Sequence, residues 1–269
     1  MRGLFIFLKE ENNMIKNFIV DRVVRGNMYD RGTDELLWSL NQIQSPSLSM
    51  ESETVDAVDA LGTPIMTFDR SKSCTFSAEN AIFDLKLLGQ QVGTEAVENP
   101  ATIIPVFEEC EVKGGKITLE KDPVDEVAYL YVLDSDGSVG ETIYLEGKEM
   151  PEGAKTFKQG ESKVEFILTG VEDGSRIFAS YDYEGKATYI VNSAKEFPKA
   201  GKFVMEVLGR DVCNPTTEVF AYLVLPNAKL SASTEVSFET EMSQAFELTA
   251  QQDYCSKTNE LFVLIIPED

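Results

Sequence analysis

Residues 176–191 read RIFASYDYEGKATYIV and contain, on a small scale, the pattern that decides the fold class. Phe178, Tyr181 and Tyr183 supply the aromatic side chains that are enriched in β-strands. Glu184-Gly185-Lys186 has the composition of a turn, and a second apolar run follows over residues 187–191. We interpret this stretch as two strands joined by a turn.

The same alternation of strand and turn extends from residue 102 to the end of the chain. Turn residues such as Lys113-Gly114-Gly115 and Glu172-Asp173-Gly174 separate short apolar runs. Many short strands at short spacing predict a mainly β protein, an antiparallel sandwich or barrel, and not a parallel α/β fold. A small inserted β module is expected around residues 121–200. The predicted strands are 102–112, 116–119, 127–133, 142–145, 164–168, 176–183, 187–191, 202–208, 218–225, 229–238, 245–250 and 261–266.

Upstream, residues 18–24 and 36–40 form two further apolar runs, with hairpin chemistry in the Gly-rich residues 26–32 between them. Trp38, the only tryptophan, is predicted to lie in the core. Residues 66–77 are predicted to form a half-buried strand whose buried face carries Phe68, Cys74 and Phe76.

One flanking α-helix is predicted over about residues 80–92. Ser77 with Asn80 would cap its first turn, and Gly93 can close its last. Such a helix would cover the open face of a sheet. The apolar residues that fit one helical face are Ala81, Ile82, Phe83, Leu85, Leu87, Leu88 and Val92.

Residues 44–66 have a different composition. Pro46, Gly62 and Pro64 punctuate a stretch that is rich in Ser, Glu and Asp. Long excursions from a compact domain are usually functional or disordered, and the apolar residues within this one favour an ordered contact with a neighbour. We predict a long projecting hairpin or loop.

The charge of the chain restricts its partners. Its 24 Lys and Arg residues against 46 Asp and Glu residues give a net charge of −22, spread along the sequence. A surface this negative repels phosphate backbones, so nucleic-acid binding in the usual sense is disfavoured, although DNA could slide past such a wall without sticking.

The residues that most often carry chemistry are scarce. The chain has no histidine, which excludes Ser-His-Asp and Cys-His catalysis and removes the commonest metal ligand. Its four cysteines form no C-x-x-C pair and are expected to be reduced and buried. They are Cys74, Cys110, Cys213 and Cys255.

Two acidic motifs are better explained as ordinary surface features. Asp134-Ser135-Asp136-Gly137 begins like a calcium loop, but its twelfth position is Leu145 where the motif needs Glu, so a hairpin turn is expected. The carboxylate pairs Glu108/Glu109 and Glu239/Glu241 are expected by chance in so acidic a chain. We therefore expect no catalytic residue, no cofactor, no metal and no enzymatic activity.

The first residues contain a short apolar run at residues 4–8, followed by Glu10, Glu11 and Asn12. Five residues are too few for the core of an export signal or for a membrane span. Lys9-Glu10-Glu11 is compatible with a purine-rich ribosome-binding sequence ahead of Met14. We expect residues 1–13 to be disordered or translated leader, and the fold to lie in residues 14–269.

Two segments resemble the major tail tube proteins of tailed bacteriophages. The first is TPIMTFDRSKS at residues 63–73, running into AENAIFDL at residues 78–85. The second runs from VSFET at residues 236–240 through FELTA at residues 246–250 to residues 261–267, and is similar to a closing hairpin of that family. The resemblance leaves the middle of the chain unmatched.

This resemblance implies a virion protein, made in the host cytoplasm, that forms hexameric rings stacked into a tube. Its partners would be copies of itself and other tail proteins, with DNA as transiting cargo and no membrane. The excursion would reach a neighbouring subunit, and surplus carboxylates would line the channel. The residues expected at the subunit contact are Val55, Val58, Leu61, Arg70 and Lys72.

Two alternatives stay open at this point. The first is another phage structural protein, from the neck, the baseplate or the capsid decoration. The second is a surface adhesin or carbohydrate-binding β-sandwich, which predicts exposed aromatic side chains and an export signal.

Overall fold

The computed structural model describes residues 17–233, 235–238, 240, 243–253 and 259–267, and divides the chain into two units. The first unit comprises residues up to Ala96 and from Ile190 onward, and the second comprises Val97–Tyr189. Each has its own sheet and its own apolar core. The second unit overlaps the module expected around residues 121–200, but its first strand begins at Val97.

The first unit has an eight-stranded antiparallel sheet and one helix, α1 (Leu85–Val92). Along the sheet the strand order is β2-β1-β12-β13-β14-β4-β3, and β15 pairs with β13. The strands are β1 (Phe18–Asp30), β2 (Leu36–Leu40), β3 (Ile43–Val58), β4 (Pro64–Asn80), β12 (Ala200–Asp211), β13 (Glu218–Leu230), β14 (Gln244–Ala250) and β15 (Val263–Ile265).

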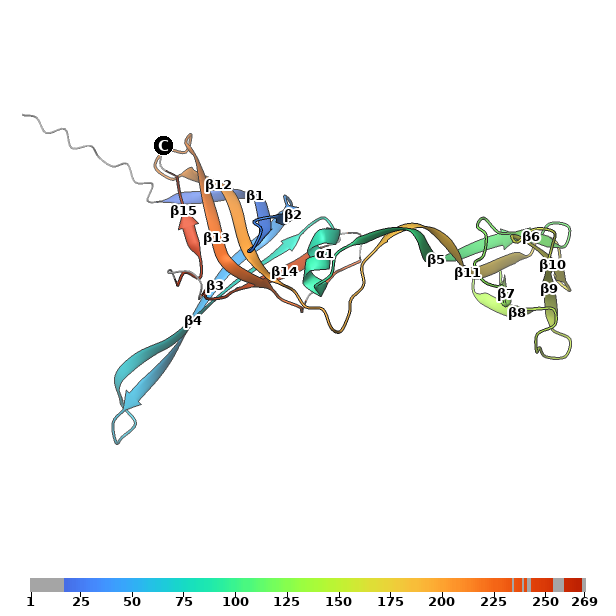
Figure 1. The fold of residues 1–269 in the computed structure, drawn as a ribbon, viewed down its shortest axis with the longest axis horizontal. Coiled ribbons are helices and arrows are strands. Elements are labelled where there is room, and N and C mark those ends of the chain that lie inside the picture. The colour runs from blue at the N-terminus through green and yellow to red at the C-terminus, as the bar shows by residue number, and fades with distance from the viewer. Residues whose placement is uncertain (1–16, 234, 239, 241–242, 254–258, 268–269) are drawn as a thin grey trace, which may run out of the picture. The chain divides into compact units, whose positions relative to one another are not determined.

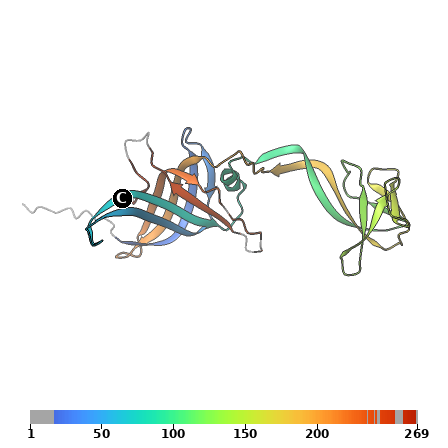
Figure 2. The ribbon, with the colours of Figure 1, turned by 90° about the horizontal axis from the view of Figure 1, so that it is seen from below.

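The connection between β2 and β3 forces this sheet to curl. These strands lie at opposite ends of the strand order, and a flat sheet would hold them about 29 Å apart at about 4.8 Å per strand. Only Asn41 and Gln42 join Leu40 to Ile43, a path that spans at most about 11 Å. The two halves of the curled sheet therefore face each other in a sandwich-like arrangement (Figure 2).

The core of the first unit fills the space that this curl encloses. Trp38 on β2 lies 5.8 Å, centroid to centroid, from both Phe203 on β12 and Phe246 on β14. Phe76 on β4 lies 5.1 Å from Phe203. Aromatic contacts thus join strands from both ends of the sheet, and the prediction that Trp38 is buried is confirmed, at 1% exposure.

Buried glutamines hold helix α1 against β14. The Gln244 side chain accepts a hydrogen bond from the Asp84 backbone N–H at 2.9 Å and donates to Gln91 Oε1 at 3.2 Å. Asp84 also caps the helix, because its carboxylate accepts from the Leu87 N–H at 2.8 Å. The capping predicted at Ser77 and Asn80 is wrong, since both residues belong to β4; Gly93 does end the helix, with φ 81°.

The second unit has a seven-stranded sheet in the order β5-β11-β7-β8-β9-β10-β6. Its ladders are antiparallel except for β8 and β9, which pair in parallel. The strands are β5 (Val97–Glu111), β6 (Lys116–Thr118), β7 (Tyr129–Leu133), β8 (Val139–Leu145), β9 (Lys155–Gln159), β10 (Glu165–Thr169) and β11 (Arg176–Tyr189).

The second sheet curls for the same reason as the first. Strands β5 and β6 end the strand order on opposite sides, yet a four-residue turn from Val112 to Gly115 joins them. The enclosed core contains Leu130, Ile143, Phe157 and Ile177, each fully buried or nearly so.

The predicted fold class is confirmed: antiparallel ladders predominate in both units, with one flanking helix and one long projecting hairpin, β3–β4, among the described residues (Figure 1). The turn predicted at Glu184-Gly185-Lys186 is wrong, because these residues lie inside β11, where a register shift between Gly185 and Ala187 absorbs the local irregularity. The hairpin predicted across residues 26–32 is confirmed as the antiparallel pair β1–β2, but residues 26–30 continue β1 and the chain reverses after Asp30.

Among the described residues, α1 is eight residues long, and no helix there has the length and apolar character needed to cross a membrane.

The buried glutamine contact generates a stability prediction. Replacing Gln244 with Ala leaves the Asp84 N–H without its partner inside the protein, which we expect to lower the free energy of unfolding by about 2 kcal/mol. Urea unfolding followed by circular dichroism measures it. Gln251→Ala, at an exposed position, is the control; equal stability of the two variants would contradict the assigned role of Gln244.

Candidate assembly surface

The outer part of the β3–β4 hairpin extends beyond the core. Every residue from 49 to 73 is exposed, and we call this segment the arm. Figure 1 shows the arm running beyond the other strands of its sheet. The core-facing residues of the same hairpin begin at Cys74, which is buried, and Leu48, which is half-buried.

Polar contacts within the arm fix its shape. The Thr67 hydroxyl donates to Asp56 at 2.6 Å and the Ser71 hydroxyl to Glu53 at 3.0 Å, in each case across the two strands. At the tip, the Asp59 carboxylate accepts hydrogen bonds from the backbone N–H groups of Leu61 and Thr63. The arm is therefore a defined hairpin and not an open loop.

A β-bulge in β4 changes which residues share a face. Glu53 pairs with Ser71, whereas the next residue, Thr54, pairs with Asp69, so Arg70 is the extra residue. Beyond the bulge Phe68 pairs with Val55 on the face opposite to that of Cys74. The prediction that Phe68 shares a buried face with Cys74 and Phe76 is wrong, and Phe68 is 44% exposed.

The arm carries a high density of exposed apolar side chains. A two-stranded hairpin alone is marginally stable in water, and exposed apolar patches of this kind mark interaction sites. In the described part of the chain, none of these residues belongs to the core of the first unit. The large exposed apolar residues of the arm are Met50, Val55, Val58, Leu61, Ile65, Met66 and Phe68.

The structure distributes the five predicted contact residues along the arm. Val55 and Arg70 come together around Phe68, with the Arg70 guanidinium 5.8 Å from the ring centroid. Val58 and Leu61 lie at or beside the tip, where Leu61 is 91% exposed. Lys72 lies apart from them, at the root of the arm.

Sequence reasoning placed Ile65 and Met66 in the projecting segment 44–66 but did not name them as contact residues. It assigned Phe68 to the half-buried strand at residues 66–77. The alternation of apolar residues in residues 66–76 could not reveal the bulge at Arg70, which reverses the faces.

A cavity of about 370 Å³ lies at the root of the arm. Met50, Lys72 and Cys74 line it from the hairpin, and Leu261 and Phe262 line it from the C-terminal part of the chain. Most of its lining is apolar, so it offers a second surface suited to apolar side chains.

Strands β1 and β3 lie next to each other where the curled sheet comes round on itself, and we call the line between them the seam. Strands β1 and β3 approach closely at Gly26, where a Cβ would lie 2.5 Å from Ile43 Cδ1. Strand β2 pairs with β1 only between Gly26 and Tyr29. Within the described part of the chain, residues 18–25 of β1 therefore pair with a strand on one side only, which is β12. A groove of about 750 Å³ lies between residues 20–25 and the start of β3.

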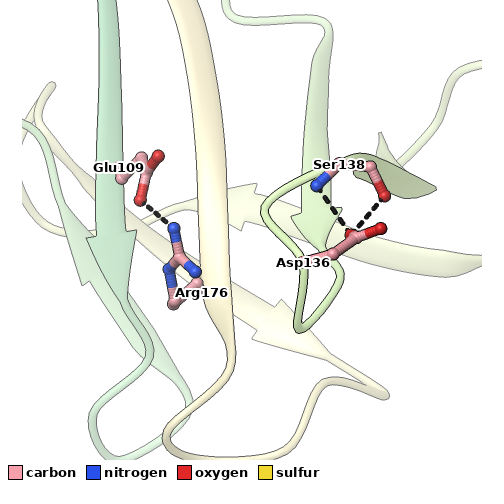
Figure 3. A network of polar contacts seen from close by, with 4 residues as sticks. All are labelled: Glu109, Asp136, Ser138 and Arg176. Carbon is pink, nitrogen blue, oxygen red and sulfur yellow. Dashed lines mark hydrogen bonds and ion pairs between the residues drawn. The ribbon is translucent and has the colours of Figure 1, made fainter.

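The acidic motifs are engaged in local contacts (Figure 3). Glu109 forms an ion pair with Arg176 at 2.6 Å, and Glu108 accepts hydrogen bonds from the Glu120 N–H. In the predicted hairpin turn, which is confirmed, hydrogen bonds from Ser138 to the carboxylate lower the pKa of Asp136. The described residues contain no cluster of three metal-ligating side chains, and the pair Glu239/Glu241 lies outside them.

The three described cysteines are free thiols in different surroundings. Cys74 is buried, Cys110 is half-buried and Cys213 is exposed, so the expectation of burial is wrong for Cys213; Cys255 lies outside the described residues. Burial, together with the neighbouring carboxylate of Glu108, raises the pKa of Cys110 to about 12.

Comparison with known proteins gives one family. The sequence model of the YomU/Tube protein family matches residues 17–260, a range that spans both units. A search of the curated proteins found no match for the chain.

The thiol environments predict unequal alkylation. A pKa near 12 leaves a thiolate fraction at pH 8 on the order of a thousandfold below that of an ordinary thiol, and the thiolate is the reactive form. In reduced, folded protein we expect iodoacetamide to modify Cys213 at least about tenfold faster than Cys110. Peptide mass spectrometry measures both rates, with urea-unfolded protein as control. Equal rates in the folded protein would contradict the prediction.

Proposed function

Because the chain belongs to the YomU/Tube family of phage tube proteins, we propose that copies of it assemble into hexameric rings that stack into a tail tube. Membership of this family makes it a structural component of the virion tail, a role that involves no catalysis. The observation that supports assembly most directly is the arm, whose 25 residues are all exposed and lie outside the core of their own subunit.

We assign the arm to the contact between successive rings. A projecting element that reaches from one subunit to the next gives a heterologous contact, which extends without closing and so suits stacking. The apolar tip around Val58 and Leu61 would be buried in the next ring. The cavity at the root of the arm, beside Cys74, could accept the arm tip of a neighbouring subunit, because its lining is mainly apolar.

The seam suits the contact within a ring. The unpaired edge of residues 18–25 presents backbone hydrogen-bonding groups that a strand of a neighbouring subunit could satisfy by β-augmentation. Across the groove, β3 pairs with β4 alone among the described strands, so its other edge is also available. Pro46, near the start of β3, lacks an N–H and limits uncontrolled pairing there.

The net charge of −22 supports the passage of DNA through the tube. Carboxylates that line the channel would repel the phosphate backbone and prevent adhesion during ejection. Partners in this arrangement are copies of the chain and other tail proteins, and DNA passes as unbound cargo.

A substitution at the arm tip tests the stacking role. Val58→Asp places a charge in the proposed apolar contact, and we expect it to abolish tubes in negative-stain micrographs or to raise the protein concentration needed for assembly at least about tenfold. Since Val58 is 54% exposed, the fold should be unaffected.

Val139→Asp is the matched control, because Val139 is 57% exposed but lies in the second unit. It should assemble as the unmodified protein does. Normal tubes from the Val58→Asp variant would remove the arm from the stacking contact, and featureless monomers from the unmodified protein would refute assembly itself.

Electron cryomicroscopy of assembled tubes tests the ring and the channel. We expect sixfold symmetry and an excess of carboxylates on the inner wall. Carboxylates placed mainly on the outer wall would contradict the proposed channel, and another symmetry would contradict the hexamer.

A further inference from the structure

The outward face of the second sheet carries a row of aromatic side chains. On β11, Ile177, Ala179 and Tyr181 are buried in the core, so the alternate residue Phe178 points outward. Five outward rings on four successive strands form what we call the aromatic stripe. They are Phe107 on β5, Phe178 on β11, Tyr131 and Tyr129 on β7, and Tyr144 on β8.

Ring contacts join the stripe into two neighbouring groups, Phe107–Phe178–Tyr131 and Tyr129–Tyr144. The Phe178 centroid lies 6.3 Å from that of Phe107, with the two rings within 5° of parallel, and 6.3 Å from that of Tyr131. Tyr129 follows two residues before Tyr131 on the same face and lies 5.8 Å from its cross-strand partner Tyr144. The stripe is open to solvent at Phe107, which is 69% exposed, and at Tyr129, which is 49% exposed.

The tyrosine hydroxyls of the stripe differ from other tyrosine hydroxyls of the protein in their hydrogen bonding. Elsewhere, Tyr181 accepts a hydrogen bond from the Lys121 N–H and Tyr222 donates one to Glu206. Within the described part of the chain, the hydroxyls of Tyr129, Tyr131 and Tyr144 make no hydrogen bond to the protein. They are free to bind hydroxyl groups of a ligand.

The charge of the second unit restricts which ligand fits. Aromatic rows on a sheet face bind single-stranded nucleic acids where a positive groove accompanies them. Val97–Tyr189 contains nine Lys or Arg residues and twenty Asp or Glu residues, a net charge of −11, which repels such a polyanion. An uncharged ligand meets no such penalty.

The face also differs from a dry contact between protein subunits. Five of its large side chains are rings, beside the exposed aliphatic residue Ile103 on the same face of β5, and polar groups lie among them, including the Arg176–Glu109 ion pair beside Phe178. The flat, electron-rich faces of aromatic rings attract the C–H groups of a sugar ring, while carboxylates and phenol hydroxyls bind its hydroxyl groups.

We propose that the aromatic stripe is a binding site for neutral oligosaccharides, with the pyranose rings of the ligand stacked along Phe107, Phe178 and the three tyrosines. Sheet faces of small β-barrels such as the OB-fold are known to bind oligosaccharides. The site would let the assembled protein adhere to an uncharged glycan. It does not depend on tube assembly, because its residues lie within one unit of one chain.

Isothermal titration of the full-length protein tests the site. The probes are the β-1,4-linked hexamer of N-acetylglucosamine, cellohexaose and single-stranded poly-dT. We expect one or both oligosaccharides to bind and poly-dT not to bind. The double variant Phe107→Ala/Tyr129→Ala should weaken oligosaccharide binding at least about tenfold, because two stacking contacts are lost.

Phe220→Ala removes an exposed aromatic ring from the first unit and should leave binding unchanged. Thermal unfolding checks that the variants keep their fold, and each single substitution is made as well, so that a folded variant is available. Absence of binding by either oligosaccharide at millimolar concentration would overturn the proposal, as would undiminished binding by the folded double variant.

Two other outcomes would also overturn the proposal, because they would give the aromatic stripe a different role. Binding of poly-dT that the double variant loses would make the stripe a nucleic-acid site. Loss of tubes or of oligomers in the double variant, with no oligosaccharide binding by the unmodified protein, would make it a contact between copies. Normal glycan binding by a protein that forms no tubes would refute the assembly role alone.

Discussion

Leu40 and Ile43 belong to strands at opposite ends of the first sheet, and the two residues between them cannot bridge a flat sheet of that width. The sheet has to curl, and the curl creates the enclosed space that Trp38, Phe76 and Phe203 fill. Burial of these rings supplies much of the apolar stabilisation of the unit. The second sheet obeys the same constraint through the short turn between β5 and β6.

The curl also decides which parts of the first unit are left for other molecules. Because β1 and β3 meet only near Gly26, a groove with unpaired strand edge remains between them. Strands β3 and β4 are much longer than β14, the next strand of the sheet, and their outer parts extend beyond the core as the arm. Both features expose groups that an isolated subunit cannot satisfy, which is what a subunit of a tube requires.

In the second unit the two faces of the sheet have separate roles. The inner face is apolar and closed around Leu130 and Phe157, whereas the outer face combines aromatic rings with charges. This division follows from the period of two along each strand, which sends Ile177 inward and Phe178 outward. One set of residues therefore stabilises the unit, and a different set determines the chemistry of its surface.

The sequence by itself determined the strand-rich class, the helix ended by Gly93, the excursion near residues 44–66 and the lack of histidine chemistry, because these follow from composition and local period. It also placed Val55, Val58 and Leu61 in a projecting segment, since apolar residues among Ser and Glu are visible in the chain itself. Only the tertiary structure decided which face of the arm carries Phe68, because a single extra residue at Arg70 reverses the alternation beyond it. It alone decided that Asp84 caps the helix and that the Glu184-Gly185-Lys186 segment continues a strand, because a partner strand far away in the chain satisfies that backbone. The aromatic stripe likewise exists only after strands distant in sequence pair in a fixed register, which no local pattern encodes.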